Sequence, residues 1–338
     1  MSVSSARNRR GAGLLLVSAS VVVGFVVATG VGSSDLSLSQ VLDVFLGGGD
    51  AAARGIVLDF RLARVLLAAC VGAGLAAAGA SYQAVLRNPL ADPFILGVSG
   101  GAALGAVISI ALVQPSGLGD SIVRPAAAFV GAVVTLAVLF GLARFQGRTE
   151  TTSLLLMGVV LNALASAAIQ FLVSAGDPAR FQGTLSFLMG AMNAPSWRSL
   201  AMIAIFAGAG IALLLTHAHT LNLLALGDDE AAQLGIDVDR ATWTVVLAAS
   251  LVTAASVAFA GIIGFVGLIV PHAMRTLFGS DHRFLLPACA LGGATALMLA
   301  DAAARTLCAP AELPVGVVTA LIGGPFFLIL LIRRLRAA

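Results

Sequence analysis

The sequence predicts an all-α integral membrane protein whose chain crosses the bilayer ten times. Hydrophobic residues make up 59% of the 338 residues, charged residues only 10%, and the mean hydropathy is +1.03. A soluble globular domain carries roughly 25% charged residues, so this composition excludes a water-soluble fold. A spanning helix needs about 20 mostly apolar residues, and charge-free runs of that order recur along the chain. We therefore expect a single transmembrane domain over residues 1–338.

The charge-free runs set the expected spans. The stretch from Ala241 to Met274 is too long for one crossing, and Gly261 and Gly264 offer a break, so we divide it in two. The first run follows a cluster of arginines and resembles the start of a signal peptide, but it exceeds the 7–15 residues typical of one, and we expect it to be retained. The ten expected spans are 14–31, 65–86, 94–113, 125–143, 151–175, 199–216, 241–260, 261–278, 284–300 and 313–332.

The arginine distribution predicts the orientation. An even number of crossings puts both termini on one side, and twelve of the 19 basic residues fall on that side against seven on the other. Cytoplasmic loops carry the excess of positive charge, so we expect a multi-pass protein of the cytoplasmic (inner) membrane with both termini in the cytoplasm.

Three connections between spans have a predicted structure. On the outer side, Pro178 and Pro195 bracket an apolar stretch too short to span, which predicts a short outer helix over 181–192. The longest inner connection is 217–240, where Asp228 or Asp229 is expected to cap a short helix that Gly235 ends. At the inner turn before span 94–113, we expect Asp92 to cap that span and Pro93 to occupy its first turn.

Several classes of function are excluded or disfavoured by residue content. All 19 basic residues are Arg, so a P-loop, which needs a Lys against the phosphates, is absent and any ATP must be bound by another chain. There is no basic stripe for nucleic acid, no metal-ligand spacing and no catalytic constellation, which predicts neither an enzyme nor a metal site. The three cysteines are interpreted as inert packing residues.

A secondary transporter is the alternative from a different class. Proton or sodium coupling needs ionisable groups inside spans, and the expected span interiors hold only neutral polar groups such as Gln83, Asn162 and Gln170. Asp301 falls at the outer end of its span, where we interpret it as a cap or interface residue. Proton coupling is therefore disfavoured.

Arginines near the outer ends of spans and glycines within spans are the remaining notable features. Arg61 and Arg64 lie three residues apart and share a helix face, either as headgroup anchors or as a cationic dock for an acidic partner, a patch that Arg305 could extend. Small residues allow close helix packing in lipid, so the glycine sets predict a dense bundle. These glycines are Gly72, Gly74, Gly79, Gly261, Gly264 and Gly267.

Five stretches of the chain together resemble one family, the FecCD-type permeases of ABC importers for iron chelates, heme and cobalamin. The resemblance covers nearly the whole chain in the family's order. The strings that carry it are RLARVLLAACVGAGLAAAGASYQAVLRNPLADPFILGVSGGAALGA (61–106), LLLMGVVLNALASA (154–167), LNLLALGDDEAAQLGI (221–236), GIIGFVGLIVPHAMR (261–275) and DHRFLLPACALGGATALMLADAAARTLCAPAELPVGVVTALIGGPFFLILL (281–331).

The resemblance implies an assembly. It consists of a homodimer with its pathway along the two-fold axis, two inverted four-helix repeats per subunit, two cytoplasmic ATP-binding subunits and an extracytoplasmic substrate-binding protein. ATP and magnesium would sit on the ATPase partner, with no cofactor on this chain. The implied cargo is a metal chelate, first a ferric siderophore, with cobalamin or heme as alternatives.

The resemblance also implies roles for individual residues. The family's docking arginines correspond to Arg61, Arg64 and Arg305, although Ala63 replaces the usual proline between the first two. The family's gate and pathway correspond to Thr151, Thr152, Asn162 and Gln170, although Glu150 departs from the expected small polar residue and Asn162 and Gln170 could instead form interhelical hydrogen bonds. The family's ATPase-coupling residues correspond to Leu226, Gly227, Asp228, Asp229, Glu230, Gln233, Leu234 and Gly235.

Overall fold

The protein is helical throughout its described part. The computed structural model describes residues 3–32, 36–94, 96–112, 122–145, 151–176 and 178–337, and all regular structure within these ranges is helical. The helices are α1 (Val3–Gly30), α2 (Leu38–Phe45), α3 (Ala51–Arg54), η1 (Gly55–Leu62, a π-helix), α4 (Ala63–Val85), α5 (Val98–Leu112), α6 (Arg124–Phe145), α7 (Thr151–Ala175), α8 (Pro178–Leu188), α9 (Trp197–Thr216), α10 (Ala218–Leu224), α11 (Asp228–Gln233), α12 (Val238–Ala260), α13 (Val266–Phe278), α14 (His282–Thr306) and α15 (Val315–Ala337).

The helix lengths modify the expectation of ten full-length spans. Seven helices in the described residues are long and apolar enough to cross a membrane, and α5, α13 and the segment Val315–Leu330 of α15 are shorter apolar helices. The 15 residues of α5 and 13 of α13 rise about 20 Å, less than the roughly 30 Å of a hydrocarbon core. Residues 94, 96, 97 and 261–265, which we expected inside spans, precede these helices as turns or irregular backbone.

The break between α12 and α13 lies where the sequence predicts it. Helix α12 ends at Ala260, and Gly261 follows with φ of 74°. Phe265, immediately before α13, also has a left-handed φ of 68°, an unusual conformation for a bulky residue. Its ring occupies the place where Gly323 of α15 has no side chain, which holds the irregular segment against the bundle.

Glycines allow the central helix α4 to pack closely on its neighbours. A Cβ at Gly72 would overlap the carbonyl of Gly293 in α14, and one at Gly79 would overlap the carbonyl of Gly267 in α13. The dense bundle predicted from these glycines is therefore confirmed. Gly264 is different, because a Cβ there would meet open space. Cys308 also departs from its expected packing role, since it is exposed.

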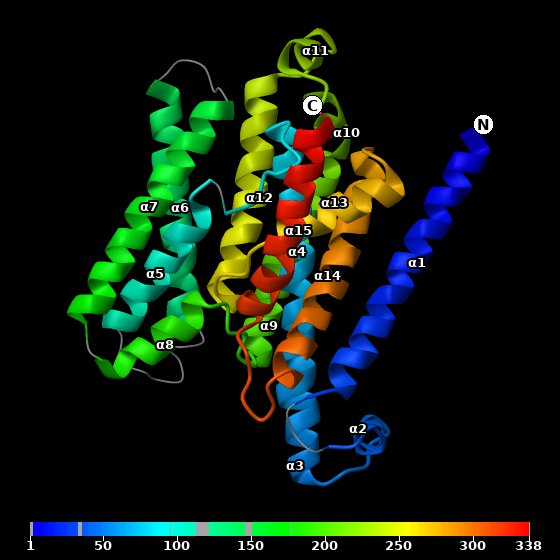
Figure 1. Ribbon diagram of the computed structural model, residues 1–338, viewed down its shortest axis with the longest axis vertical. Helices are drawn as coiled ribbons and strands as arrows, with labels where there is room; N and C mark the ends of the chain where they lie inside the picture. The colour runs from blue at the N-terminus through cyan, green and yellow to red at the C-terminus, as the bar shows by residue number, and fades with distance from the viewer. Residues whose placement is uncertain are drawn as a thin grey trace.

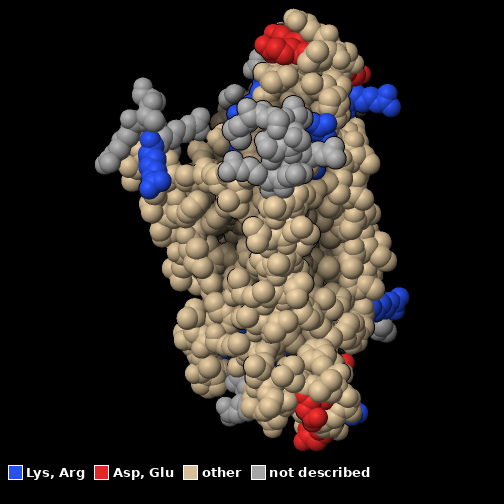
Figure 2. All heavy atoms as spheres, turned by 90° about the vertical axis from the view of Figure 1, so that its right-hand side faces the viewer, with Lys and Arg blue, Asp and Glu red and all other residues tan. Residues whose placement is uncertain are grey.

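The two ends of the molecule carry different elements (Figure 1). Both termini lie at one end with α10 and α11, and α2, α3 and α8 lie towards the other. The charge-free runs of the sequence predict neither α2 nor the extension of α4 by α3 and η1 into a continuous 35-residue helix, Ala51–Val85. On the face in Figure 2, charged residues gather near the two ends and an uncharged belt lies between them, as expected for a membrane protein.

Candidate functional site

The three arginines assigned to the outer end lie together in a buried ion cluster. Arg64 donates from Nε to Oδ1 of Asp301 at 2.9 Å, and Arg305 donates from Nε to Oδ2 of the same carboxylate at 2.9 Å. Arg64 also donates from Nη1 to Oε2 of Glu312 at 2.6 Å. The side chains of Asp301 and Arg305 are 0% and 1% exposed, so water does not screen this interaction.

The same cluster holds the end of α1. Arg305 donates to the carbonyls of Ala28 and Val31 at 2.7 and 2.9 Å, and Arg61 donates to the carbonyl of Thr29 at 3.4 Å. The last carbonyls of a helix have no partner within the helix and carry a partial negative charge, so guanidinium groups stabilise them. The cluster therefore ties α1, α4 and α14 together at the outer end.

This geometry corrects two expectations. Asp301 is not a cap or interface residue but a buried carboxylate within α14 that binds two arginines. Arg61 and Arg64 are not headgroup anchors either, because they are only 3% and 4% exposed. The spacing of Asp301 and Arg305, four residues apart on one helix, is a signal that could have predicted their pairing.

A cavity of about 390 Å³ adjoins the cluster. Arg61, Arg305 and Glu312 line it together with Phe60 and the backbone around Gly32 and Gly55. Three guanidinium groups and two carboxylates of the described residues meet beside this cavity.

The connection 217–240 lies at the inner end of the molecule and contains α10 and α11. Helix α11 has Asp228, Asp229 and Glu230 in its first turn as predicted, but its N-cap is Gly227, with φ of 145°, so neither aspartate caps it. Gly235, with φ of 84°, follows the end of the helix as predicted. Asp228 pairs with Arg87 of the α4–α5 connection at 2.9 Å.

The predicted coupling residues form an exposed surface at this end. Gly227 is buried, whereas Leu226 and Leu234 are 62% and 60% exposed despite being apolar. Exposed large apolar side chains beside acidic ones on a connection outside the bundle indicate a surface that another protein covers. The remaining predicted residues, Asp228, Asp229, Glu230, Gln233 and Gly235, are exposed as well.

A polar contact that no sequence pattern predicts joins this connection to α14. Asn222 of α10 donates from Nδ2 to Oδ1 of Asp281 at 2.9 Å, and its Oδ1 accepts from the backbone N–H of His282 at 2.8 Å. Hydrogen bonding from Arg283 holds the pKa of Asp281 well below its usual range, so Asp281 stays ionised. Movement of α10 is thereby linked directly to the inner end of α14.

The predicted pathway residues on α7 have different environments. Asn162 donates from Nδ2 to the carbonyl of Phe94 at 2.6 Å, so it holds the irregular segment before α5. Gln170 is exposed. Thr151 and Thr152 begin α7, but their side chains and the whole of Glu150 lie outside the described residues.

The inner turn before α5 differs from the prediction. Asp92 accepts from the backbone N–H of Phe94 at 2.9 Å and closes a local turn; it does not cap α5, which begins at Val98. Pro93 lies in the same turn and outside the first helical turn. Burial raises the pKa of Asp92 to about 6.

No metal site emerges from the part of the chain that the structure describes. Within those residues there is no group of three or more His, Cys, Asp or Glu side chains that could hold a metal ion.

Comparison with known proteins places the chain among transport proteins. The FecCD transport family matches residues 20–333. The chain is 42% identical over 282 residues to the hemin transport system permease protein HmuU of Yersinia pestis, covering 82% of this chain and 84% of that protein. It is 45% identical over 282 residues to the cobalamin import system permease protein BtuC of Halobacterium salinarum, covering 83% and 74%.

A solved structure has the same fold. It is an inward-facing structure of an ABC transporter assigned to the metal-chelate type, with a TM-score of 0.81 and 33% sequence identity. The match covers 96% of this chain and 99% of that one.

Proposed function

The chain belongs to the FecCD transport family of ABC importer permeases, and from this premise we propose that it imports a metal chelate, in the first instance a ferric siderophore. It is a multi-pass membrane permease without a catalytic site or cofactor of its own. An importer of this kind works with ATP-binding and substrate-binding partners. In the proposal two ATPase subunits, carrying ATP and magnesium, dock on 217–240 and a binding protein docks at the opposite end.

The observation that carries the proposal is the placement of two partner surfaces at opposite ends of an uncharged belt. The acidic residues of α11 and the exposed Leu226 and Leu234 on either side of it lie at one end, and the arginine cluster with its cavity lies at the other. An ATP-driven importer needs an energy input on one side and a delivery surface on the other. The positive-inside bias assigns the end with α11 and both termini to the cytoplasm.

The helix order supports two inverted four-helix repeats. Lengths run 23, 15, 22 and 25 residues for α4 to α7, and 23, 13, 25 and 23 for α12 to α15. The first long helix of each set packs on the second and third helices of the other set. Short, interrupted helices in corresponding positions are typical of inverted-repeat transporters.

The exposed face of α7 supports a homodimer with the pathway between subunits. Ser166 and Gln170 are exposed on this spanning helix. A polar carboxamide facing lipid is costly, so this edge is better placed against water or a partner helix. The adjacent edge is apolar, with exposed Val160, Leu164 and Phe171. In the proposal Gln170 faces the pathway, Thr151 and Thr152 lie at its gate, and Asn162 supports the gate through the segment at Phe94.

Docking of the binding protein is proposed to use the cavity beside Arg61 and Arg305. A carboxylate of the binding protein would approach the guanidinium groups of Arg61 and Arg305, which line this cavity. Reversing Arg61, Arg64 and Arg305 to Glu is expected to weaken docking. Because Arg64 and Arg305 also bind Asp301, Arg61→Gln is the variant that separates docking from folding.

Coupling is proposed to run through α11. Replacing Asp228, Asp229 and Glu230 together with Lys is expected to leave ATP hydrolysis running while transport stops. Normal coupling in that variant would show that the acidic turn is only a solvated helix start.

The test of the whole proposal is reconstitution with the cognate binding protein and ATPase. A ligand screen on the binding protein with ferric siderophores, heme and cobalamin identifies the cargo, and uptake into proteoliposomes is then measured with ATP and with a hydrolysis-deficient ATPase. We expect uptake only with active ATPase. Uptake without it would favour a secondary transporter, and tight binding of heme or cobalamin alone would replace the siderophore as cargo.

A further inference from the structure

Helix α2 and the residue that follows it present an apolar stripe that is largely exposed in the described chain. Its members recur at i, i+4, i+7 and i+8, the spacing of one face of a helix. They are Leu38, Leu42, Phe45 and Leu46, with exposed fractions of 58%, 54%, 46% and 87%. A contiguous patch of large apolar side chains on a surface indicates a contact with another protein or with a membrane.

The other face of α2 and its cap hold the helix in place. Ser37 and Gln40 form a capping box, in which the N–H of Gln40 donates to Oγ of Ser37 at 3.3 Å and the N–H of Ser37 donates to Oε1 of Gln40 at 2.8 Å. Val41 and Val44 are buried together with Val57 of η1. Because η1 continues into α4, α2 is attached to the outer extension of that helix.

Leu38 shows which way the apolar stripe is turned. A Cβ at Gly30, the last residue of α1, would lie 3.0 Å from Cδ1 of Leu38, so the stripe faces the end of α1. Asp43 lies about 140° around the helix from Leu38, on the polar side. Figure 1 shows α2 nearly end-on, just beyond the end of α1. The helix therefore lies across the end of the bundle, with its apolar stripe towards the spanning helices.

The neighbouring surface of α1 faces lipid. Helix α1 is the least buried of the seven candidate spans in the described residues, and Val23, Val27 and Val31 are exposed along its outer half. Helix α7, whose edge we assign to a second subunit, lies on the opposite side of the bundle (Figure 1). The stripe of α2 thus continues a surface that lipid, and not a second copy of the chain, covers.

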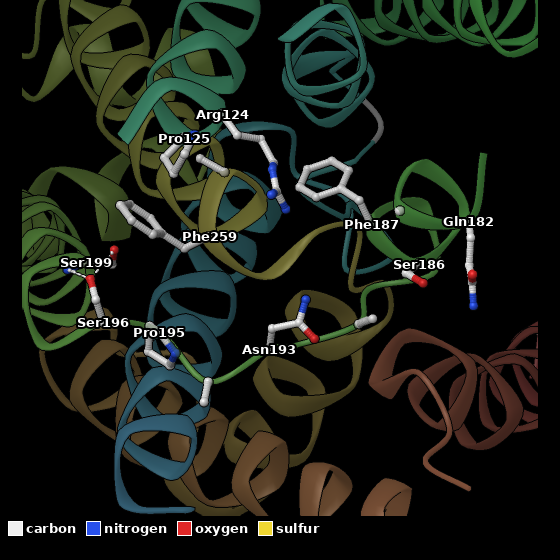
Figure 3. Close-up of a pocket in the computed structure, with 14 residues that line it drawn as sticks. Arg124, Pro125, Gln182, Ser186, Phe187, Asn193, Pro195, Ser196, Ser199 and Phe259 are labelled. Atoms are coloured by element: carbon white, nitrogen blue, oxygen red, sulfur yellow. Dashed lines mark hydrogen bonds between the residues drawn. The ribbon is translucent and has the colours of Figure 1, made fainter. Parts of the chain in front are cut away.

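The larger cavity at this end belongs to other elements. It has a volume of about 650 Å³, and the described residues that line it come from α6, α8, α9, α12 and the segment between α8 and α9 (Figure 3). A soluble protein that docks over this cavity, or over the arginine cluster, approaches from outside the membrane. The stripe of α2 is turned away from that direction, which favours lipid as its occupant.

We propose that α2 is an interfacial helix whose apolar stripe lies in the outer surface of the bilayer, at the boundary between headgroups and acyl chains. Amphipathic helices of this kind bury their apolar face about 5–10 Å into that boundary. The lipid contact holds the outer extension of α4, to which α2 is attached through Val57, at the level of the membrane surface. The inference depends on the membrane fold and not on the cargo.

The experiment measures what surrounds the stripe in the assembled transporter in phosphatidylcholine nanodiscs. A nitroxide label is attached at Leu42→Cys or at Phe45→Cys. The exposed Cys308 is replaced by Ser, and the chain without an added cysteine reports any labelling at Cys70 and Cys289. Collisions of the label with oxygen, which concentrates in hydrocarbon, are compared with its collisions with nickel(II) ethylenediaminediacetate, which stays in water.

We expect the ratio of oxygen to nickel collisions at Leu42→Cys and Phe45→Cys to be several-fold higher than at Asp43→Cys, the matched control on the polar side of α2. The ratio is also expected to approach that of Val27→Cys, the lipid-facing reference on α1. Either reporter decides the test if the other variant does not assemble.

Three outcomes overturn the inference. A ratio at both reporters equal to that of Asp43→Cys shows that the stripe faces water. Exclusion of both reagents shows that a second copy or another subunit covers it. Loss of oxygen collisions on addition of the binding protein shows that the stripe belongs to the delivery surface. ATP-driven uptake by the same preparation reports the import function separately.

Discussion

Replacing Asp301 by Asn tests the buried ion cluster most sharply. The substitution keeps the shape of the side chain and removes its charge, so no cavity forms. Asp301 accepts from Arg64 and from Arg305 at 2.9 Å each, and its side chain is 0% exposed. With Asn, two buried guanidinium groups lose their shared counterion, and the new amide N–H groups oppose donors already in place.

The expected loss is about 3–5 kcal/mol of unfolding free energy, the cost of breaking a buried ion pair. Equilibrium unfolding in mixed micelles, followed by circular dichroism, measures it. The matched control is Asp59→Asn, where an exposed carboxylate accepts from Trp197 Nε1 at 3.2 Å, and we expect less than about 1 kcal/mol.

A loss of under about 1 kcal/mol for Asp301→Asn would refute the reasoning, because it is the value of a screened surface pair. The double variant Arg64→Gln with Asp301→Asn provides an internal check. Since the two side chains are in contact, its loss is expected to be smaller than the sum of the single losses.

Three further predictions concern other parts of the molecule. Gly72→Ala is expected to destabilise by about 1–3 kcal/mol in the same unfolding assay through overlap with α14, whereas Gly264→Ala, facing open space, leaves packing unchanged. Asp92 has a raised pKa of about 6, so the folded protein binds more protons than the unfolded chain, and stability is present at low pH and lost as pH rises through 6. Asp92→Asn should remove that component from an unfolding titration between pH 4 and 7, and an unchanged profile would contradict it. Arg87→Gln, which breaks a surface pair with Asp228, is expected to change stability by less than about 1 kcal/mol; a larger loss would mean that α11 is needed for folding.

The helical membrane fold was predictable, but the lengths of α5 and α13 were not. Residues 94–97 and 261–265 are uncharged and mostly apolar, so run length alone extends the spans through them. Where the structure describes these residues, their irregular backbone survives at depth because it packs against other helices, as with Asn162 on the carbonyl of Phe94 and Phe265 on Gly323. Mean hydropathy depends only on residue types within a stretch of sequence, so it contains no information about contacts between distant residues.

The features of the candidate sites also fall into two groups, those that the local sequence predicts and those that it does not. The acidic first turn of α11 and its end at Gly235 follow from local residue order and are confirmed. The failure of Asp228 and Asp229 to cap α11, and of Asp92 to cap α5, reflects backbone conformation at Gly227 and at the Asp92 turn. Capping rules identify residues able to cap but do not locate the first helical residue.

By itself, the sequence determined that this protein lies in a membrane, that it binds no nucleotide through a P-loop, and where most helices run, because these depend on residue type and run length. Only the tertiary structure decided what the outer arginines do. Arg64 meets Asp301 across 237 residues of chain, and such a contact exists only once α4 and α14 are packed at their glycines. The burial that turns a predicted cationic surface into an ion cluster is a property of that packing.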